Sequence, residues 1–321
     1  MKTMRTVACL LVAASMASTA LAQDFPNKPI RLVSNYAAGS SIDIIARLIA
    51  KPLSEQLGQP VVVENKAGAG GDIGTDFVAK APKDGYTIGF ASPGPLVFNP
   101  MMRKSMPFAL SEISTVTLVA TGPNVLLVNP DVPARTLGEL VAYIKANPGK
   151  VNYASPGNGT SGHLAGELFK HLTGTDITHV PYKGNAEAVT DVLAGRVQLI
   201  FSGVPPIRAH VESGRLRAIA IADFRRSKQL PGVPTVAEAG LPGAESGAWY
   251  GILAPAGTPP AVLERLNAEL VKVVQRPDVR AQFDQLGIDP VGNSRADFDK
   301  MIAAEIARWK PLFAAAKITA E

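Results

Sequence analysis

The feature that most constrains the fold of this chain is a regular alternation of short apolar runs with longer amphipathic stretches. The runs have the length and composition of buried strands, and the stretches between them place apolar residues at helical spacing. This alternation predicts an α/β fold of βαβ units, in which helices cover both faces of a parallel sheet. The first expected strands are 30–34, 61–64 and 86–91, and the first expected helices are 41–57 and 73–80.

The alternation stops and then starts again, which predicts two lobes. A long apolar segment at 115–128 separates the first series from a second one that begins near residue 151. Only helices are expected after residue 255, and because such a tail cannot bury its apolar stripe alone, we expect it to pack on the first lobe. The chain would then cross twice between the lobes, near 122–129 and 247–255, as in a two-hinge clamp. The predicted lobes are 23–123 plus 253–321 (lobe 1) and 124–252 (lobe 2).

The N-terminal segment has the order of a secretory signal peptide. Lys2 and Arg5 precede an apolar run at 7–16, and Ala20-Leu21-Ala22 forms a cleavage site of small residues. The run is too short to anchor the chain in a bilayer. Residues 1–22 are therefore expected to be removed on export, so that the mature protein begins at Gln23.

Composition then excludes several classes of protein. Cys9 is the single cysteine and lies in the signal segment, so neither a disulfide nor a thiolate nucleophile is expected in the mature chain. Loss of Lys2 and Arg5 lowers the formal net charge from +5 to +3, and the remaining basic residues are scattered. Nucleic acid is therefore not an expected partner. No later apolar segment reaches the roughly 18 residues that a membrane-spanning helix needs.

The first candidate site is the segment 35–43, which follows the first expected strand and opens the first expected helix. Ser40 and Asp43 have the spacing of a capping box, with Asp in the acidic position. Unpaired N–H groups at such a helix start attract an anion when they face a cleft. The alternative is an ordinary N-cap without a ligand, since most helices begin in this way.

The second candidate site is the segment 155–163, between a strand and a helix of the second lobe. Gly157, Gly159 and Gly162 match the spacing of the dinucleotide-binding fingerprint. That motif also needs an acidic residue at the end of the next strand, and residues 180–183 offer none. A loop that cradles an anion fits these residues better, with Thr160 and Ser161 adding hydroxyl donors.

Metal binding and catalysis are not indicated by the following helix. His163, Glu167 and His171 recur every four residues and share one face, but the two histidines would lie about 12 Å apart along the axis, too far for one ion. Ser161 and His163 are too close in sequence to be assumed to form a nucleophile and its base. The chain also has no Gly-x-Ser-x-Gly elbow, His-Glu-x-x-His motif or Walker loop. We expect a binding protein with no catalytic residue, no metal and no cofactor.

Several loops are expected to meet at one rim, because ligands of open α/β sheets bind at the carboxyl ends of the strands. Loops rich in Gly, Pro and hydroxyl residues follow strands at 92–95, 182–185 and 202–205, and each alone would be an ordinary turn. The glycine-rich segment 65–74 is expected to let a helix pack closely on the sheet, or to contact the ligand. The predicted ligand-binding residues are Tyr36, Ala38, Gly39, Ser40, Ser41, Asp43, Ser92, Gly159, Thr160, Ser161, His163, Tyr182 and Ser202.

Short segments spread over the mature chain match one known family in the same order. They are 25–33 (FPNKPIRLV), 62–71 (VVENKAGAGG), 84–87 (DGYT), 159–164 (GTSGHL), 180–184 (VPYKG), 249–251 (WYG) and 255–259 (PAGTP). Together they are highly specific. The chain resembles the Bug-type extracytoplasmic solute receptors of tripartite tricarboxylate transporters.

The resemblance implies a two-lobed periplasmic-binding-protein fold of the Venus-flytrap type, with the ligand cleft between the lobes. It implies a periplasmic receptor rather than an enzyme, whose ligand is a di- or tricarboxylate, an aromatic acid or an acidic amino acid. Backbone amides, hydroxyls and ordered water would hold the carboxylate. The implied partners are the membrane permease subunits of the transporter, and the receptor itself is expected to be a monomer.

One loop departs from the family pattern. The family usually has Pro-Gly-Gly where this chain has Ala38-Gly39-Ser40, although Asp43 is retained. Because a residue other than glycine disfavours positive φ, we expect a different loop path or a loop that presents the Ser40 hydroxyl. Two other functions stay open, a periplasmic receptor that feeds a sensor kinase and an enzyme on the same two-lobed fold.

Overall fold

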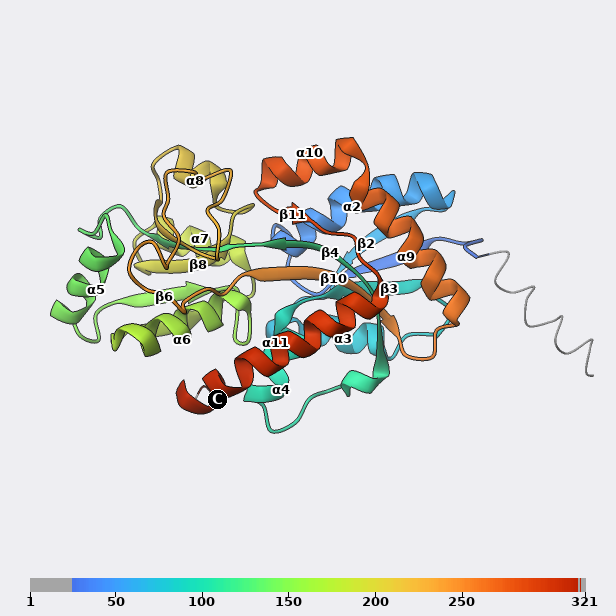
Figure 1. The fold of residues 1–321 in the computed structure, drawn as a ribbon, viewed down its shortest axis with the longest axis horizontal. Helices are drawn as coiled ribbons and strands as arrows, with labels where there is room; N and C mark the ends of the chain where they lie inside the picture. Colours follow the sequence, from blue (N-terminus) through green and yellow to red (C-terminus); the bar gives the residue numbers. More distant parts are fainter. Residues whose placement is uncertain (1–24, 317, 319–321) are drawn as a thin grey trace, which may run out of the picture.

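The computed structural model describes residues 25–316 and residue 318, which form two α/β lobes side by side (Figure 1). The predicted signal peptide at 1–22 lies outside the described residues. None of the described helices is long and apolar enough to cross a membrane. Each lobe is built on its own sheet, and the order of strands in each sheet shows which crossovers the chain makes.

The sheet of lobe 1 is mixed rather than purely parallel. Its strands are β1 (Ile30–Ser34), β2 (Val61–Asn65), β3 (Thr87–Ala91), β4 (Ile113–Gly122), β10 (Ala248–Pro255) and β11 (Asp289–Pro290), in the order β11-β4-β10-β3-β1-β2. β1 is parallel to β2 and β3, as expected. β10 returns from lobe 2 and runs antiparallel between β3 and β4, and the short β11 adds a strand where only helices were expected.

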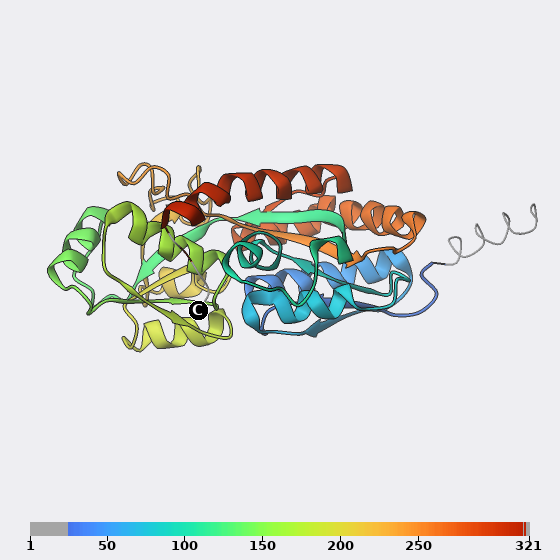
Figure 2. The same ribbon diagram turned by 90° about the horizontal axis from the view of Figure 1, so that it is seen from below.

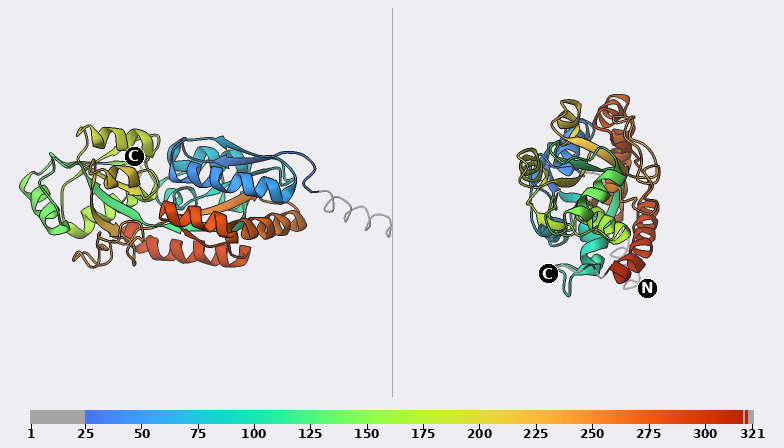
Figure 3. Two further views of the ribbon diagram at one scale, coloured as in Figure 1. Left: turned by 90° about the horizontal axis from the view of Figure 1, so that it is seen from above. Right: turned by 90° about the vertical axis from the view of Figure 1, so that its left-hand side faces the viewer.

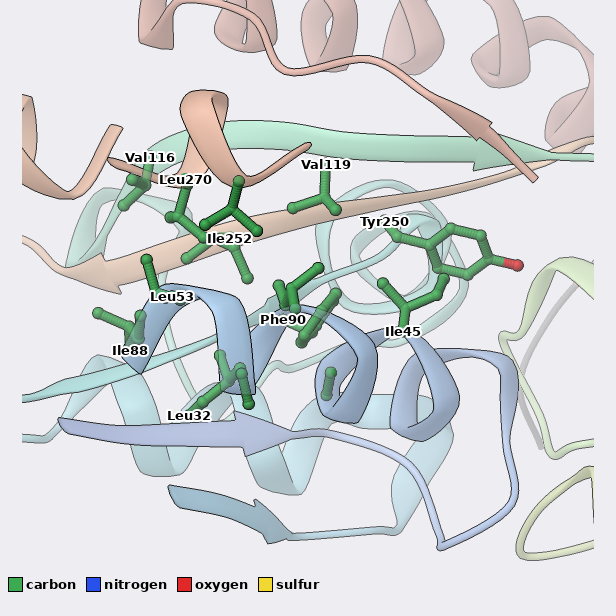
Figure 4. Packing of buried hydrophobic residues seen from close by; sticks show 14 of the residues in the cluster. Leu32, Ile45, Leu53, Ile88, Phe90, Val116, Val119, Tyr250, Ile252 and Leu270 are labelled. Atoms are coloured by element: carbon green, nitrogen blue, oxygen red, sulfur yellow. The ribbon is translucent and has the colours of Figure 1, made fainter. Parts of the chain in front are cut away.

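Helices cover both faces of this sheet (Figure 3). Because successive strand residues point to opposite faces, Leu32 packs in the cluster under one helical layer and Val33 in the cluster under the other. Figure 4 shows the first of these clusters, in which Phe90 and Ile252 lie at the centre. The helices of that layer are α2 (Ser41–Leu57), α9 (Pro260–Gln275) and α10 (Pro277–Leu286). Those of the other layer are α3 (Asp72–Ala79), α4 (Asn99–Met102) and α11 (Arg295–Ala316), with a π-helical turn η2 (Gly94–Phe98) where the sequence predicted a loop.

Lobe 2 repeats the layered arrangement around a five-stranded sheet. Its strands are β5 (Asn124–Val128), β6 (Asn152–Ser155), β7 (Thr178–Pro181), β8 (Leu199–Gly203) and β9 (Arg217–Ala222), in the order β7-β6-β8-β5-β9. Its helices are α5 (Leu137–Ala146), α6 (Ser161–Thr173), α7 (Asn185–Leu193) and α8 (Arg208–Glu212). β5 is antiparallel to β8 and β9, so here too a strand that adjoins a crossing runs against its neighbours.

The lobes are joined by two crossings and by one helix. The chain leaves lobe 1 from β4 and enters β5 through Pro123, and it returns from β9 to β10 through segment 223–247. All of β10 pairs within the first sheet, so residues 248–252 lie in lobe 1 and not in lobe 2, to which the predicted boundary assigned them. The rest of the predicted division, 23–123 plus 253–321 and 124–252, stays our proposal for the lobes. The end of α11 reaches lobe 2 (Figure 2), where Trp309 packs in one cluster with Leu164 of α6.

Candidate functional site

The loop between β1 and α2 is organised by a cap on the helix. Ser40 is the N-cap, and its Oγ accepts a hydrogen bond from the Asp43 amide at 3.2 Å. The Asp43 carboxylate reaches back to the Gly39 amide (3.0 Å) instead of the Ser40 amide of a standard capping box. Gly39 supplies the positive φ of the turn (79°), while Ser40 is extended, so the loop accommodates serine without strain.

The Asp43 carboxylate fixes the conformation of the loop between β1 and α2 through hydrogen bonds within lobe 1. Burial alone would raise the pKa of Asp43, but hydrogen bonds from Arg47, the Gly39 amide and Asn65 outweigh it and keep the pKa below its ordinary value. The carboxylate is therefore ionised near neutral pH. All the hydrogen-bond partners of this carboxylate lie within lobe 1, so Asp43 stabilises the conformation of the loop.

The loop between β6 and α6 is organised in a similar way. Thr160 is the N-cap, accepting from the His163 amide (3.3 Å) and donating its own proton to the Gly157 carbonyl (2.8 Å). The Gly159 amide donates to His163 Nδ1 at 3.1 Å. The first two amides of α6, those of Ser161 and Gly162, have no intrahelical carbonyl partner, and the same holds for Ser41 and Ile42 in α2.

A stacked pair of histidines supports this second loop. The rings of His163 and His179 lie 4.2 Å apart, and His179 Nε2 lies 2.6 Å from Ser155 Oγ at the start of the loop. Burial lowers the pKa of His163 to about 4 and that of His179 to about 3, so both rings are neutral at pH 7. Glu167, which shares a face with His163, accepts from Tyr153 Oη at 2.7 Å. No group of three or more His, Cys, Asp or Glu in the described part of the chain is arranged to hold a metal ion.

The two helix starts meet at a cavity between the lobes, which we call the interlobe cavity. The interlobe cavity has a volume of about 50 Å³, which is room for a few water molecules. Its lining carries hydroxyls, amides and apolar groups but no charged side chain. The lining residues are Tyr36, Ser40, Ser41, Ile42, Ser92, Pro93, Asn124, Pro156, Thr160, Ser161, Gly162, Asn185, Phe201, Ser202, Gly203, Ala248 and Tyr250.

The predicted ligand residues divide into two groups around this cavity. Tyr36, Ser40, Ser41, Ser92, Thr160, Ser161 and Ser202 line it. The other predicted residues are not part of the lining: Ala38, Gly39 and Asp43 in the first loop, Gly159 and His163 in the second, and Tyr182, which borders a neighbouring cavity together with Tyr36. Prediction from sequence missed Asn124 and Tyr250, although both belong to crossing segments that must pass between the lobes.

Two buried tyrosines add neutral donors to the interlobe cavity. Burial raises the pKa of Tyr250 to about 12, and its hydroxyl hydrogen-bonds Ser41. Burial likewise raises the pKa of Tyr36, whose hydroxyl donates to the Gly70 carbonyl at 2.8 Å. The Tyr250 ring belongs to the core of lobe 1 and its hydroxyl is directed toward lobe 2 (Figure 4). Both phenols keep their protons at neutral pH.

This arrangement suits a small anion. Two helix N-termini from different lobes face one space, and each contributes roughly 0.3–1 kcal/mol to holding a negative charge. A carboxylate that loses its hydration there finds amide and hydroxyl donors in exchange. Because the donors are neutral, the site holds the anion without forming a buried ion pair.

Comparison with known proteins points to one family. A family model described as the tripartite tricarboxylate transporter family receptor matches residues 45–318. Protein BugT of Bordetella pertussis is 38% identical over 305 residues, which covers 94% of this chain and 94% of BugT. A solved structure of a periplasmic transporter is 41% identical with a TM-score of 0.89, covering 92% of this chain and 99% of its own.

Two further solved structures contain ligands. An R. palustris protein with adipate is 35% identical, with a TM-score of 0.89 over 92% of this chain and 99% of that one. MatC from Rhodopseudomonas palustris with bound malate is 30% identical, with a TM-score of 0.85 over 90% of this chain and 99% of that one. Both ligands are dicarboxylates. The two-lobed architecture of the present chain is thus that of periplasmic solute-binding proteins.

Proposed function

Because this chain belongs to the tripartite tricarboxylate transporter receptor family of periplasmic solute-binding proteins, we propose that it captures a small carboxylate and delivers it to the permease subunits of such a transporter. The observation that carries the proposal is the uncharged, donor-rich interlobe cavity between the starts of α2 and α6. The adipate and malate bound by two relatives support the same ligand class. The proposal includes export with loss of residues 1–22 and action as a monomer.

In the proposed complex, backbone amides carry most of the recognition. One carboxylate accepts from the amides of Ser41 and Ile42 in lobe 1 and from those of Ser161 and Gly162 in lobe 2. Gly39, Gly159 and Thr160 act indirectly, because their amide or hydroxyl protons are already donated within their own loops. Since the donors come from both lobes, the ligand stabilises the closed arrangement over an open one.

A ligand screen tests the proposed function. The mature protein, from Gln23 onward, is expected to unfold at a higher temperature in the presence of a small carboxylate, because a ligand that binds only the folded state at 100 times its Kd stabilises it by about 2.7 kcal/mol. The neutral amides of the same acids are matched controls and should leave the unfolding temperature unchanged. Stabilisation by sugars or cations, with no response to any carboxylate, would overturn the proposal.

The contribution of a single backbone amide is testable at Ser161. Proline is well accepted at the first position of a helix, and Thr160 before it already has the extended backbone (ψ 162°) that a following proline requires. Ser161→Pro therefore removes one donor from the cavity and leaves α6 intact. Relative to Ser161→Ala, which removes only the hydroxyl, we expect calorimetry to show an affinity loss of about 1–3 kcal/mol. Equal affinities of the two variants would exclude the Ser161 amide as a donor.

A further inference from the structure

Asn124 lies where the connections between the lobes meet the interlobe cavity. It is the first residue of β5 and directly follows Pro123, through which the chain enters lobe 2. The residue is 2% exposed, and it lines the interlobe cavity. β5 pairs here with both of its neighbours, so that Asn124 lies opposite Gly203 of β8 and Ala222 of β9. One buried residue therefore belongs both to a crossing between the lobes and to the candidate anion site.

The Asn124 side-chain amide is oriented by one acceptor and one donor. Its nitrogen donates to the carbonyl of Ser246, which lies in the return segment 223–247 just before β10 begins. Its oxygen accepts from the hydroxyl of Ser161, the first residue of α6, at 3.4 Å. Because a carbonyl can only accept and an amide nitrogen can only donate, turning the amide over would lose the bond to Ser246. The return segment thus fixes how Asn124 faces the interlobe cavity.

One proton of this amide is left for a ligand. An asparagine side chain carries two N–H donors, and the Ser246 carbonyl accepts from one of them. Among the residues that the structure describes, none accepts from the second N–H, although the side chain lines the interlobe cavity. A buried donor is costly unless water or a ligand accepts from it. A carboxylate in the interlobe cavity supplies such an acceptor.

We propose that Asn124 couples capture of the carboxylate to the position of the two crossings. One of its amide protons is donated to the ligand and the other to the Ser246 carbonyl, so a single side chain joins the ligand to the return segment. This inference deepens the proposed function and rests on it, because the carboxylate must occupy the interlobe cavity. Hydrogen bonds in a buried chain polarise one another, so each of these two bonds strengthens the other. Ligand binding therefore favours the arrangement of the crossings in which Asn124 meets Ser246.

A second buried asparagine next to the same strand supplies a matched control. Asn129 directly follows the other end of β5 and is 5% exposed. Its Nδ2 donates to the Val192 carbonyl at 2.8 Å, as that of Asn124 donates to Ser246, but Asn129 is not part of the lining of the interlobe cavity. Asn129→Ala and Asn124→Ala therefore remove the same kind of buried hydrogen bond, and both should lower the stability of the folded protein. Only Asn124→Ala should weaken ligand binding.

Calorimetry and small-angle X-ray scattering test the coupling. Acetate, malate, succinate and adipate are the probes, and the acid that binds the wild-type protein most tightly is used for the variants. We expect Asn124→Ala to lower the affinity about ten-fold or more and to reduce the compaction that the ligand induces, whereas Asn129→Ala should bind within about two-fold of wild type. Urea titrations compare the stabilities of the two variants. Equal losses of affinity in both, or wild-type affinity in Asn124→Ala, would overturn the coupling.

Asn124→Asp keeps the shape of the side chain and replaces its donors by a negative charge. Because the lining contains no charged side chain, we expect the affinity at pH 7.5 to fall about a hundred-fold, and burial should raise the pKa of the new carboxyl group. Acidification to pH 5.5 should then recover several-fold of this loss, whereas the affinity of wild type weakens over the same range. An affinity of Asn124→Asp that falls in parallel with wild type would overturn the coupling alone. If none of the four acids binds the wild-type protein, the proposed function fails, and the coupling with it.

Discussion

Replacing Gly203 by valine is expected to lower the affinity for the carboxylate at least a hundred-fold, equivalent to about 2.7 kcal/mol, while the unliganded protein stays folded. Gly203 lies in β8 of lobe 2 and lines the interlobe cavity. A Cβ at this position would lie 2.9 Å from Ser41 Oγ and 3.4 Å from the Tyr250 hydroxyl, both in lobe 1. The branched side chain therefore obstructs closure and fills part of the anion site, and overpacking of this kind typically costs about 1–3 kcal/mol before any donor is lost.

Substitutions of different size at Gly203 distinguish obstruction of the anion site from unfolding of the protein. Gly203→Ala should have a smaller effect than Gly203→Val, because a single methyl group would be close to the Ser41 and Tyr250 hydroxyls and in ordinary van der Waals contact with Pro205. Gly138→Ala is the matched control, since nothing lies within 4 Å of its Cβ, and it should bind like wild type. Titration calorimetry gives the affinities, and circular dichroism of the unliganded variants checks folding. If Gly203→Val binds within three-fold of wild type, closure at β8 is not required for binding.

Acidification from pH 6.5 to pH 5 is expected to lower the free energy of unfolding by about 3 kcal/mol through His163 and His179. Burial lowers the pKa of His163 to about 4 and that of His179 to about 3, whereas both are near 6.5 in the unfolded chain. Across this range the unfolded state takes up protons that the folded state excludes. The stabilisation is therefore present above pH 6.5 and is lost progressively as the pH falls, to about pH 4 for His163 and about pH 3 for His179.

The comparison that isolates this effect is the double variant His163→Gln with His179→Gln. Its free energy of unfolding from urea titrations should be lower than that of wild type at pH 7.5 but should change much less between pH 6.5 and 5. The stacked rings support the segment that contains Thr160, so the affinity of wild type for its ligand should weaken over the same range. Parallel pH profiles of wild type and the double variant would show that the histidines do not couple protonation to stability.

The local structure of the site was predictable because short-range signals determine it. Ser40 and Thr160 cap their helices by accepting hydrogen bonds from amides three residues later, so a few neighbouring residues are enough to predict where each helix begins. The strand and helix periods of β1, α2 and α6 are likewise contained in their own residues. The resemblance to a family of two-lobed receptors also drew on short segments, and the comparisons confirmed it.

The side chains that line the interlobe cavity and the order of strands in each sheet depend on contacts between distant parts of the chain. The sequence placed His163 among the ligand residues because it lies in the loop that opens a helix. In the structure its ring stacks on His179 of the neighbouring strand and is not part of the lining of the interlobe cavity. Tyr250 reaches the interlobe cavity because β10 returns between β3 and β4, and this antiparallel return, together with the short β11, makes the sheet mixed. Periodicity and capping reside in neighbouring residues and therefore determine the elements of this protein, whereas the pairing of strands and the closure of the lobes depend on contacts that only the folded chain brings together.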